Sequence, residues 1–215
     1  MPTFICRTEA DEAHALDIFR NSVHHLRSTC LMATDTKLVT FNGLSFDLPV
    51  LITRYRLLGL TPLTCDVRKY GSKDVIDLMA DLTFNDNAGA AILSRSQASL
   101  ARRFGIPTPD QTSGKDIAAM VAAGDYEAVA AHCQADLDVL RELYRRVYGA
   151  KAKGVLLDLE TVAIANLADY RADIKGDKRL TDPKKVEVDI DAKLEKAALD
   201  PYLCRIACLG FEMLA

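Results

Sequence analysis

Short apolar runs alternate with helical patterns in the first part of the chain. Residues Thr3–Arg7 are typical of a short strand, and from Glu9 onward apolar side chains recur at the spacing of a helix. A second predicted strand, Lys37–Phe41, ends at Asn42, and a helix is predicted over Asp47–Leu58. Strands and helices that alternate in this way indicate an α/β domain.

The middle of the chain is mostly helical. Residues Asp74–Met79 fit a short strand or a turn. Helical patterns then begin at Gln97, Ser113 and Asp125, and the third carries an apolar stripe that continues to Gly149. We therefore expect one long amphipathic helix before residue 149.

The last third begins with small and polar residues and ends with an apolar strand. Residues 149–154 are typical of a flexible connector. We expect strands over Val155–Leu159 and Leu203–Phe211. Between them, residues 169–191 are rich in charged side chains and predict an exposed loop with some helix.

Composition narrows the class of protein mainly by exclusion. The 215 residues are 49% hydrophobic and 27% charged, with a net charge of −3, which is typical of a globular domain without a basic, nucleic-acid-binding character. No apolar run approaches the ~20 residues of a membrane span, and no signal-peptide pattern opens the chain. We expect an intracellular protein of bacterial or phage origin, with no membrane partner and with its six cysteines as reduced thiols.

Two groups of acidic residues are candidates for chemistry on the predicted strands and turns. Asp158 and Glu160 are two residues apart on a strand, so both carboxylates point from the same face. Burying them is costly unless they meet a cation, although an Asp-x-Glu pattern also arises by chance. Asp47 opens a predicted helix, where capping alone could explain it. Capping does not explain the nearby Asn42 and Phe46.

A third candidate lies on the long predicted helix. His132 and Asp136 are four residues apart and therefore share one face, a spacing that is also common for surface contacts. Asp138 is the alternative to Asp136 as the acid beside His132, but it lies about 120° around the helix from His132. Several carboxylates favour Mg²⁺ or Mn²⁺, and two such ions beside a histidine that accepts a proton are typical of a phosphodiester hydrolase.

These motifs resemble those of the DEDD, or DnaQ-like, 3'-to-5' exonucleases, most closely the branch related to the proofreading domain of family B DNA polymerases. Val155–Thr161 is similar to the first motif of that family, Asn42–Leu51 to the second and His132–Asp136 to the third. Asp74–Met79 resembles the segment between them. The resemblance implies a ribonuclease H-like α/β fold, with a mixed sheet flanked by helices, in a single domain over residues 1–215.

The order of the motifs departs from the family, because the first motif comes last in this chain. We interpret this order as a circular permutation of the family's fold. Residues 155–215 would correspond to the family's N-terminal part, residues 1–148 to the remainder, and residues 149–154 to a connector of the original ends. The hypothesis requires the strands Thr3–Arg7 and Leu203–Phe211 to be antiparallel neighbours.

The resemblance also assigns the site. It implies four ligands for two Mg²⁺ or Mn²⁺ ions, namely Asp47, Asp136, Asp158 and Glu160. Asn42, Phe46 and Thr161 would contact the terminal nucleotide, with core packing as the alternative for Phe46 and Thr161. His132 would be the general base, but its role stays open. One subtype of the family has a tyrosine four residues before the acid of the third motif, and another has a histidine five residues before it. His132 is a histidine, but it lies four residues before Asp136.

The expected reaction is hydrolysis of the terminal phosphodiester at the 3' end of single-stranded DNA, which releases nucleoside monophosphates. Two alternatives remain at this point. The enzyme could act on RNA, since no residue is assigned to the 2'-hydroxyl, or the chain could be a catalytically impaired nucleic-acid-binding module of the same fold. A polymerase partner has no supporting motif.

Overall fold

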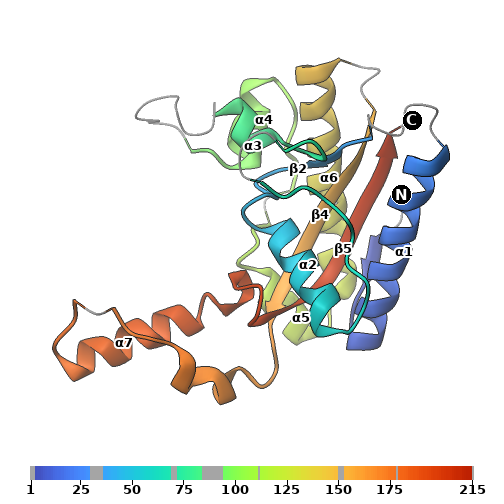
Figure 1. Ribbon diagram of the computed structural model, residues 1–215. Coiled ribbons are helices and arrows are strands. Elements are labelled where there is room, and N and C mark those ends of the chain that lie inside the picture. Colours follow the sequence, from blue (N-terminus) through green and yellow to red (C-terminus); the bar gives the residue numbers. More distant parts are fainter. Residues whose placement is uncertain are drawn as a thin grey trace.

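A five-stranded mixed sheet forms the centre of the protein (Figure 1). The computed structural model describes residues 3–29, 36–68, 72–83, 94–110, 112–149, 153–177 and 179–214. In space the strand order is β1-β5-β4-β2-β3, in which β2 runs parallel to β3 and β4, and β5 runs antiparallel to β1 and β4. The strands are β1 (Thr3–Ile5), β2 (Leu38–Thr40), β3 (Val75–Asp77), β4 (Gly154–Ala163) and β5 (Cys204–Leu214).

Helices cover both faces of this sheet, which confirms the expected α/β class. Helices α1 and α2 pack on one face, and α4, α5 and α6 pack on the other. Between β4 and β5, α7 projects away from the sheet with short 3-10 helices on either side (Figure 1). The helices are α1 (Glu9–Thr29), α2 (Asp47–Leu57), α3 (Leu78–Leu82), α4 (Gln97–Arg103), α5 (Ile117–Ala123), α6 (Tyr126–Tyr148), η1 (Leu167–Asp173), α7 (Pro183–Leu194) and η2 (Ala197–Leu199).

The central strand β4 supplies side chains to both faces. Leu157 and Leu159 pack into the core with α1 and α2, whereas Leu156 packs into the core with α6. Side chains alternate along a strand, so Asp158 and Glu160 share the α6 side with Leu156. The strand runs well beyond the predicted end at Leu159, and both acids therefore lie inside it.

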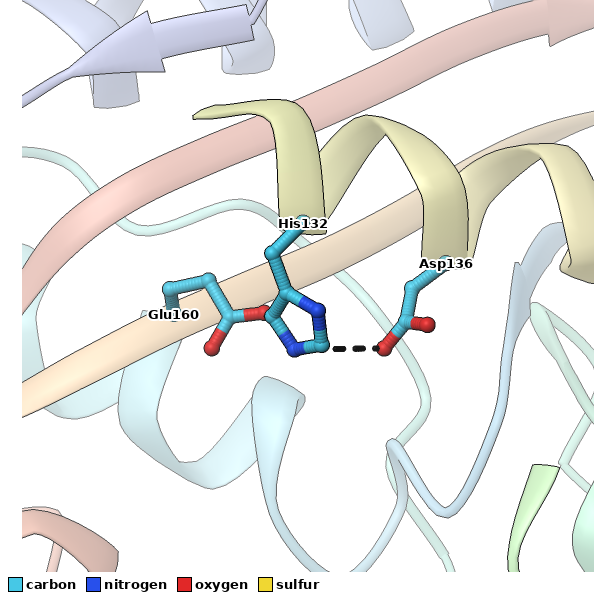
Figure 2. A group of neighbouring side chains, drawn as sticks. All are labelled: His132, Asp136 and Glu160. Atoms are coloured by element: carbon cyan, nitrogen blue, oxygen red, sulfur yellow. Dashed lines mark ion pairs between the residues drawn. The ribbon is translucent and has the colours of Figure 1, made fainter. Parts of the chain in front are cut away.

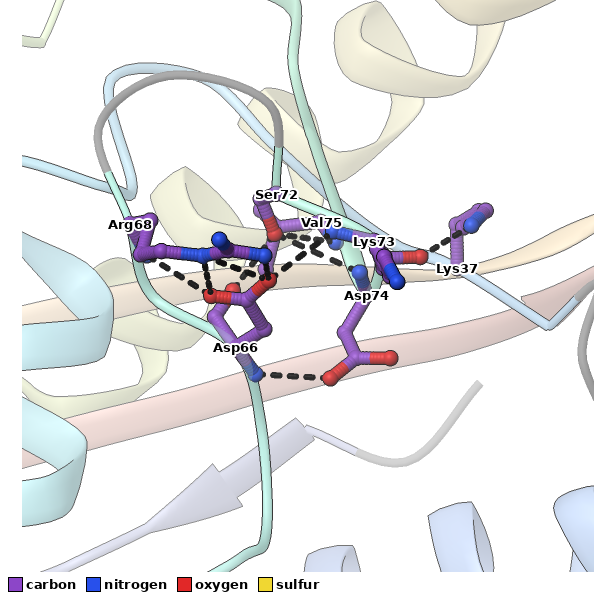
Figure 3. Close-up of polar contacts among 7 residues, drawn as sticks. All are labelled: Lys37, Asp66, Arg68, Ser72, Lys73, Asp74 and Val75. Atoms are coloured by element: carbon purple, nitrogen blue, oxygen red, sulfur yellow. Dashed lines mark hydrogen bonds and ion pairs between the residues drawn. The ribbon is translucent and has the colours of Figure 1, made fainter.

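Polar contacts hold the segment that leads into β3 (Figure 3). The guanidinium of Arg68 pairs with Asp66, with Nη2 2.7 Å from Oδ2, and the backbone N–H of Asp66 donates to Asp74 Oδ2 at 2.6 Å. The ammonium group of Lys37 donates to the carbonyl of Lys73. Because Lys37 precedes β2 and Lys73 precedes β3, this contact joins the starts of two parallel strands.

Two sequence-based boundaries need correction. Ser113 does not cap α5, which begins at Ile117; instead, its backbone N–H and its hydroxyl both donate to Asp116 Oδ2 at 2.9 Å. The predicted connector over 149–154 includes residues 150–152, which lie outside the described residues, and Gly154 is already the first residue of β4.

The cysteines of the described segments are free thiols, as expected. They are Cys6, Cys65, Cys133, Cys204 and Cys208. Cys30 lies outside the described residues. Among the helices of the described segments, none combines the length and the apolar character that crossing a bilayer requires.

Candidate active site

Two carboxylates lie in the interior of the central strand β4. The side chain of Glu160 is buried, with 7% of the residue exposed. Asp158 Oδ2 is also buried, and no atom of the described residues donates a hydrogen bond to it. A buried carboxylate oxygen without a donor costs free energy unless a cation is present. The middle of β4 is therefore suited to a positively charged ligand.

Helix α6 brings a histidine and a third carboxylate to the same place (Figure 2). His132 and Asp136 lie on successive turns, with His132 Nε2 3.8 Å from Asp136 Oδ2. The same Nε2 atom lies 3.4 Å from Glu160 Oε1 of β4. One ligand atom from each of these three residues falls within 4.8 Å of the others. By contrast, Asp138 is exposed and pairs with Arg141.

The fourth carboxylate comes from the first residue of α2. Asp47 is 5% exposed, and the helix is capped at Phe46 without any side-chain hydrogen bond. The pKa of Asp47 is raised to about 7, mainly by burial and also by the charges of Asp77 and Asp136, while hydrogen bonding to nearby backbone groups opposes the rise. Leu159, which separates the two acids of β4, packs in the same core cluster as Leu48 of α2, so α2 lies against β4 beside the site.

The four acids share one electrostatic environment. Burial raises the pKa of Asp158 well above its ordinary value, and the charges of Asp47 and Asp136 add to the effect. The pKa of Glu160 is raised to about 10. Burial is the largest cause, and the charges of Asp158 and Asp136 contribute to the rise. Divalent cations with oxygen ligands would relieve this repulsion, so the donor set fits Mg²⁺ or Mn²⁺.

Asp110, which no sequence motif singled out, contacts the histidine from the other side. Its Oδ2 atom lies 2.5 Å from His132 Nδ1, and its Oδ1 atom accepts the backbone N–H of Thr112 at 2.9 Å. Burial raises the pKa of Asp110, but the hydrogen bonds from His132 and Thr112 outweigh it and leave the pKa below its ordinary value. Asp110 lies in a loop 22 residues before His132, so no helical or strand spacing could have revealed the contact.

Asp77 lies in the segment that resembles the family between its motifs, but no pattern in the sequence assigned it a role. It ends β3 and caps α3, accepting the backbone N–H groups of Met79 and Ala80. Its carboxylate also accepts the backbone N–H groups of Asn42 at 2.9 Å and Leu44 at 3.0 Å. One side chain thus fixes the turn between β2 and α2, in which Asn42 adopts a positive φ of 62°.

The predicted nucleotide-contacting residues lie in two places. Asn42 and Phe46 belong to the turn before α2, where the half-buried Phe46 packs against the core. Thr161 follows Glu160 on β4, and its hydroxyl donates to the carbonyl of Ala198 at 2.6 Å. Their contacts with a nucleotide stay predictions.

A cavity of about 350 Å³ adjoins the histidine side of the site. Its lining includes Asp110, His132 and Asp136, together with hydroxyl side chains of Thr112 and Ser113. A cavity of about 700 Å³ lies elsewhere, against η1 and η2, and none of the four site acids lines it. Of the four site acids, Asp136 lines the smaller cavity, which therefore opens onto the α6 side of the site.

Residues 21–147 match the family described as predicted 3'-5' exonucleases related to the exonuclease domain of PolB. The match spans more than half of the chain. The chain belongs to this family. It is therefore a 3'-5' exonuclease, and its mixed sheet with flanking helices is consistent with the ribonuclease H-like fold. No curated protein and no solved structure matches the chain.

Exonuclease domains of this kind use divalent metals. The residues that match the family include only two of the four acids of the site. Asp47 and Asp136 lie within the matched residues, whereas Asp158 and Glu160 follow them in the chain. The sheet brings the two parts together, because β4 pairs in parallel with β2, the strand that precedes the turn to Asp47.

Proposed function

We propose that this exonuclease removes nucleotides one at a time from the 3' end of single-stranded DNA by a two-metal mechanism. The observation that carries the proposal is the convergence of four carboxylates from α2, α6 and β4 beside a histidine. Asp158 Oδ2 supports it in particular, because this buried oxygen has no hydrogen-bond donor among the described residues.

Each carboxylate has a defined place in this proposal. Asp47, Asp136, Asp158 and Glu160 would hold two Mg²⁺ or Mn²⁺ ions. When bound, the ions would neutralise charge on the scissile phosphate and on the leaving oxygen. The repulsion among the buried carboxylates supports this assignment, since it favours cation binding over an empty site.

His132 would act as the general base. Its Nε2 atom faces Glu160 and Asp136, where it can take a proton from the attacking water. As the new P–O bond forms, the bond from phosphorus to the 3'-oxygen of the preceding nucleotide breaks. That oxygen takes up a proton, so the products are a nucleoside monophosphate and a strand one nucleotide shorter.

We further propose that the fold is a circular permutation of the family's single domain, with residues 155–215 in the place of the family's N-terminal part. Two observations support this proposal. The end strands β1 and β5 are antiparallel neighbours, with Phe4 opposite Leu209. In addition, the family match ends before β4, although β4 occupies the centre of the sheet and carries two of the four acids.

The proposed substrate contacts are Asn42 and Phe46 in the turn before α2, and Thr161 on β4. Phe46 would stack on or wedge against the terminal base. A comparison of matched DNA and RNA oligonucleotides, each labelled at the 5' end, tests the choice of substrate. Equal or faster shortening of the RNA would replace the DNA proposal with an exoribonuclease.

The decisive experiment compares the protein with its Asp47→Ala variant in a Mn²⁺-dependent assay on a 5'-labelled single-stranded DNA. We expect a ladder of shortened products from the unaltered protein and none from Asp47→Ala. Asp138→Asn is the matched control, because Asp138 is an exposed acid of α6 that pairs with Arg141.

Two outcomes would contradict the proposal. A ladder that persists in Asp47→Ala would place the activity elsewhere or in a contaminant. Oligonucleotide binding without any degradation in Mn²⁺ would favour the alternative of a catalytically impaired binding module.

A further inference from the structure

We propose that Asp110 is a positioning residue that holds the His132 ring in one tautomer, with the proton on Nδ1 and the lone pair of Nε2 directed at the acidic cluster. The contact that carries this proposal is the 2.5 Å distance between Asp110 Oδ2 and His132 Nδ1. Asp110 comes from the loop between α4 and α5, outside the three predicted motifs.

The hydrogen bonds around Asp110 determine which ring nitrogen carries the proton. A carboxylate only accepts hydrogen bonds, so the atom facing Oδ2 must be a donor. The other oxygen is already engaged, because Oδ1 accepts the backbone N–H of Thr112 at 2.9 Å. A neutral imidazole with its proton on Nδ1 has a free lone pair on Nε2.

The same contact also fixes where Nε2 points. The His132 residue is 7% exposed, so its ring has little freedom to reorient toward solvent. With Nδ1 held by Asp110, Nε2 lies 3.4 Å from Glu160 Oε1 and 3.8 Å from Asp136 Oδ2 (Figure 2). A lone pair at this position can take a proton, and the negative charge of Asp110 then stabilises the charged ring. This catalytic consequence rests on the proposed function, whereas the tautomer does not.

Asp110→Asn tests the proposal without changing the shape of the side chain. The backbone N–H of Thr112 can only donate, so it keeps the amide oxygen of the new side chain on its side. The amide NH₂ group then faces His132 Nδ1, which must become an acceptor. The proton is expected to move to Nε2, where it occupies the lone pair that faces Glu160.

The first measurement is ¹⁵N NMR of histidine-labelled, metal-free protein at about pH 9. The chain has 4 histidines, and the other three, His14, His24 and His25, are exposed on α1. The signal that disappears in His132→Gln identifies His132. We expect a protonated Nδ1 in the unaltered protein and a protonated Nε2 in Asp110→Asn, while the signals of the exposed α1 histidines stay unchanged.

The second measurement is the rate of DNA shortening. We expect kcat of Asp110→Asn to fall by about 10- to 100-fold with an unchanged KM for the oligonucleotide, because substrate binding does not depend on the tautomer. Asp138→Asn, which alters an acid on α6 that does not contact His132, should leave both constants unchanged.

The outcomes separate this inference from the proposed function. A protonated Nε2 in the unaltered protein, or a tautomer that does not change in Asp110→Asn, would overturn the positioning role. An inactive unaltered protein with the expected change of tautomer would overturn the proposed function and leave the positioning role in place. An active Asp110→Asn protein with the changed tautomer and full kcat would overturn the catalytic consequence.

Discussion

Gly210 lies directly opposite Asp158 in the antiparallel pairing of β5 with β4. A Cβ atom added at Gly210 would lie 2.7 Å from Cys133 Sγ and 2.7 Å from Leu137 Cδ1 of α6. Only a residue without a side chain permits this approach of α6 to the sheet. Gly210 therefore leaves room for the side chains of Cys133 and Leu137 to pack on the sheet beside Asp158.

We expect Gly210→Ala to push α6 outward, to lower the free energy of unfolding by about 1–3 kcal/mol and to reduce exonuclease activity. Urea denaturation and the DNA-shortening assay measure the two effects. Gly114→Ala is the control for stability, because a Cβ atom there meets nothing within 4 Å. Unchanged stability and activity in Gly210→Ala would show that α6 does not depend on this contact.

The raised pKa values of the site predict how the stability of the metal-free protein depends on pH. Burial raises the pKa of Asp47 from 3.8 to about 7. Between these pH values the folded protein keeps a proton that the unfolded chain has lost, so unfolding releases a proton and stability falls as the pH rises. We expect Asp47→Asn to be more stable than the unaltered protein in EDTA, by a margin that grows from about pH 4 to pH 7 and then levels off.

Urea denaturation of both proteins at a series of pH values checks this margin. Mg²⁺ or Mn²⁺ should stabilise the unaltered protein more at pH 8 than at pH 5, because protonated carboxylates bind cations poorly. A margin that shrinks as the pH rises would contradict the raised pKa of Asp47.

A buried ion pair joins α1 to α2. The guanidinium of Arg54 contacts Glu12 through two hydrogen bonds of 2.6 and 2.8 Å, and both residues are less than 5% exposed, at 4% and 1%. We expect Glu12→Gln to lower the free energy of unfolding by about 3–5 kcal/mol, because it leaves the buried Arg54 charge with only the exposed carboxylate of Glu9, at 3.8 Å.

The exposed pair of Arg145 and Glu142, 3.5 Å apart, provides the matched control for this experiment. Glu142→Gln should cost about 0–1 kcal/mol, since solvent screens the charges. Equal effects of Glu12→Gln and Glu142→Gln in urea denaturation would argue against a structural role for the buried pair.

Asp77 combines a helix cap with control of the turn before α2. We expect Asp77→Ala to lower the free energy of unfolding by about 2 kcal/mol through loss of the cap, and to raise the KM for the oligonucleotide because the turn that carries Asn42 and Phe46 loses its anchor. Asp182→Ala removes the comparable cap of α7 and should leave KM unchanged. A normal KM in Asp77→Ala would separate this turn from substrate binding.

The parts of the fold that depend on local pattern were predictable from the sequence. The apolar stripe of α6 and the apolar run of β5 each arise within one element, so both were visible in the sequence. Boundaries were less accurate where a polar side chain competes with the backbone, as at Ser113, which bonds to Asp116 instead of capping α5.

The sequence by itself identified the family and predicted the four acids of the site, because residue type and local spacing define the motifs around Asp47, Asp136 and Asp158. Only the tertiary structure decided that Asp110 contacts His132, that Asp77 anchors the turn at Asn42 and that Gly210 admits α6. Each of these contacts joins residues from different elements, brought together by sheet order and helix packing. A local sequence pattern does not predict such contacts, since they depend on which elements become neighbours when the chain folds.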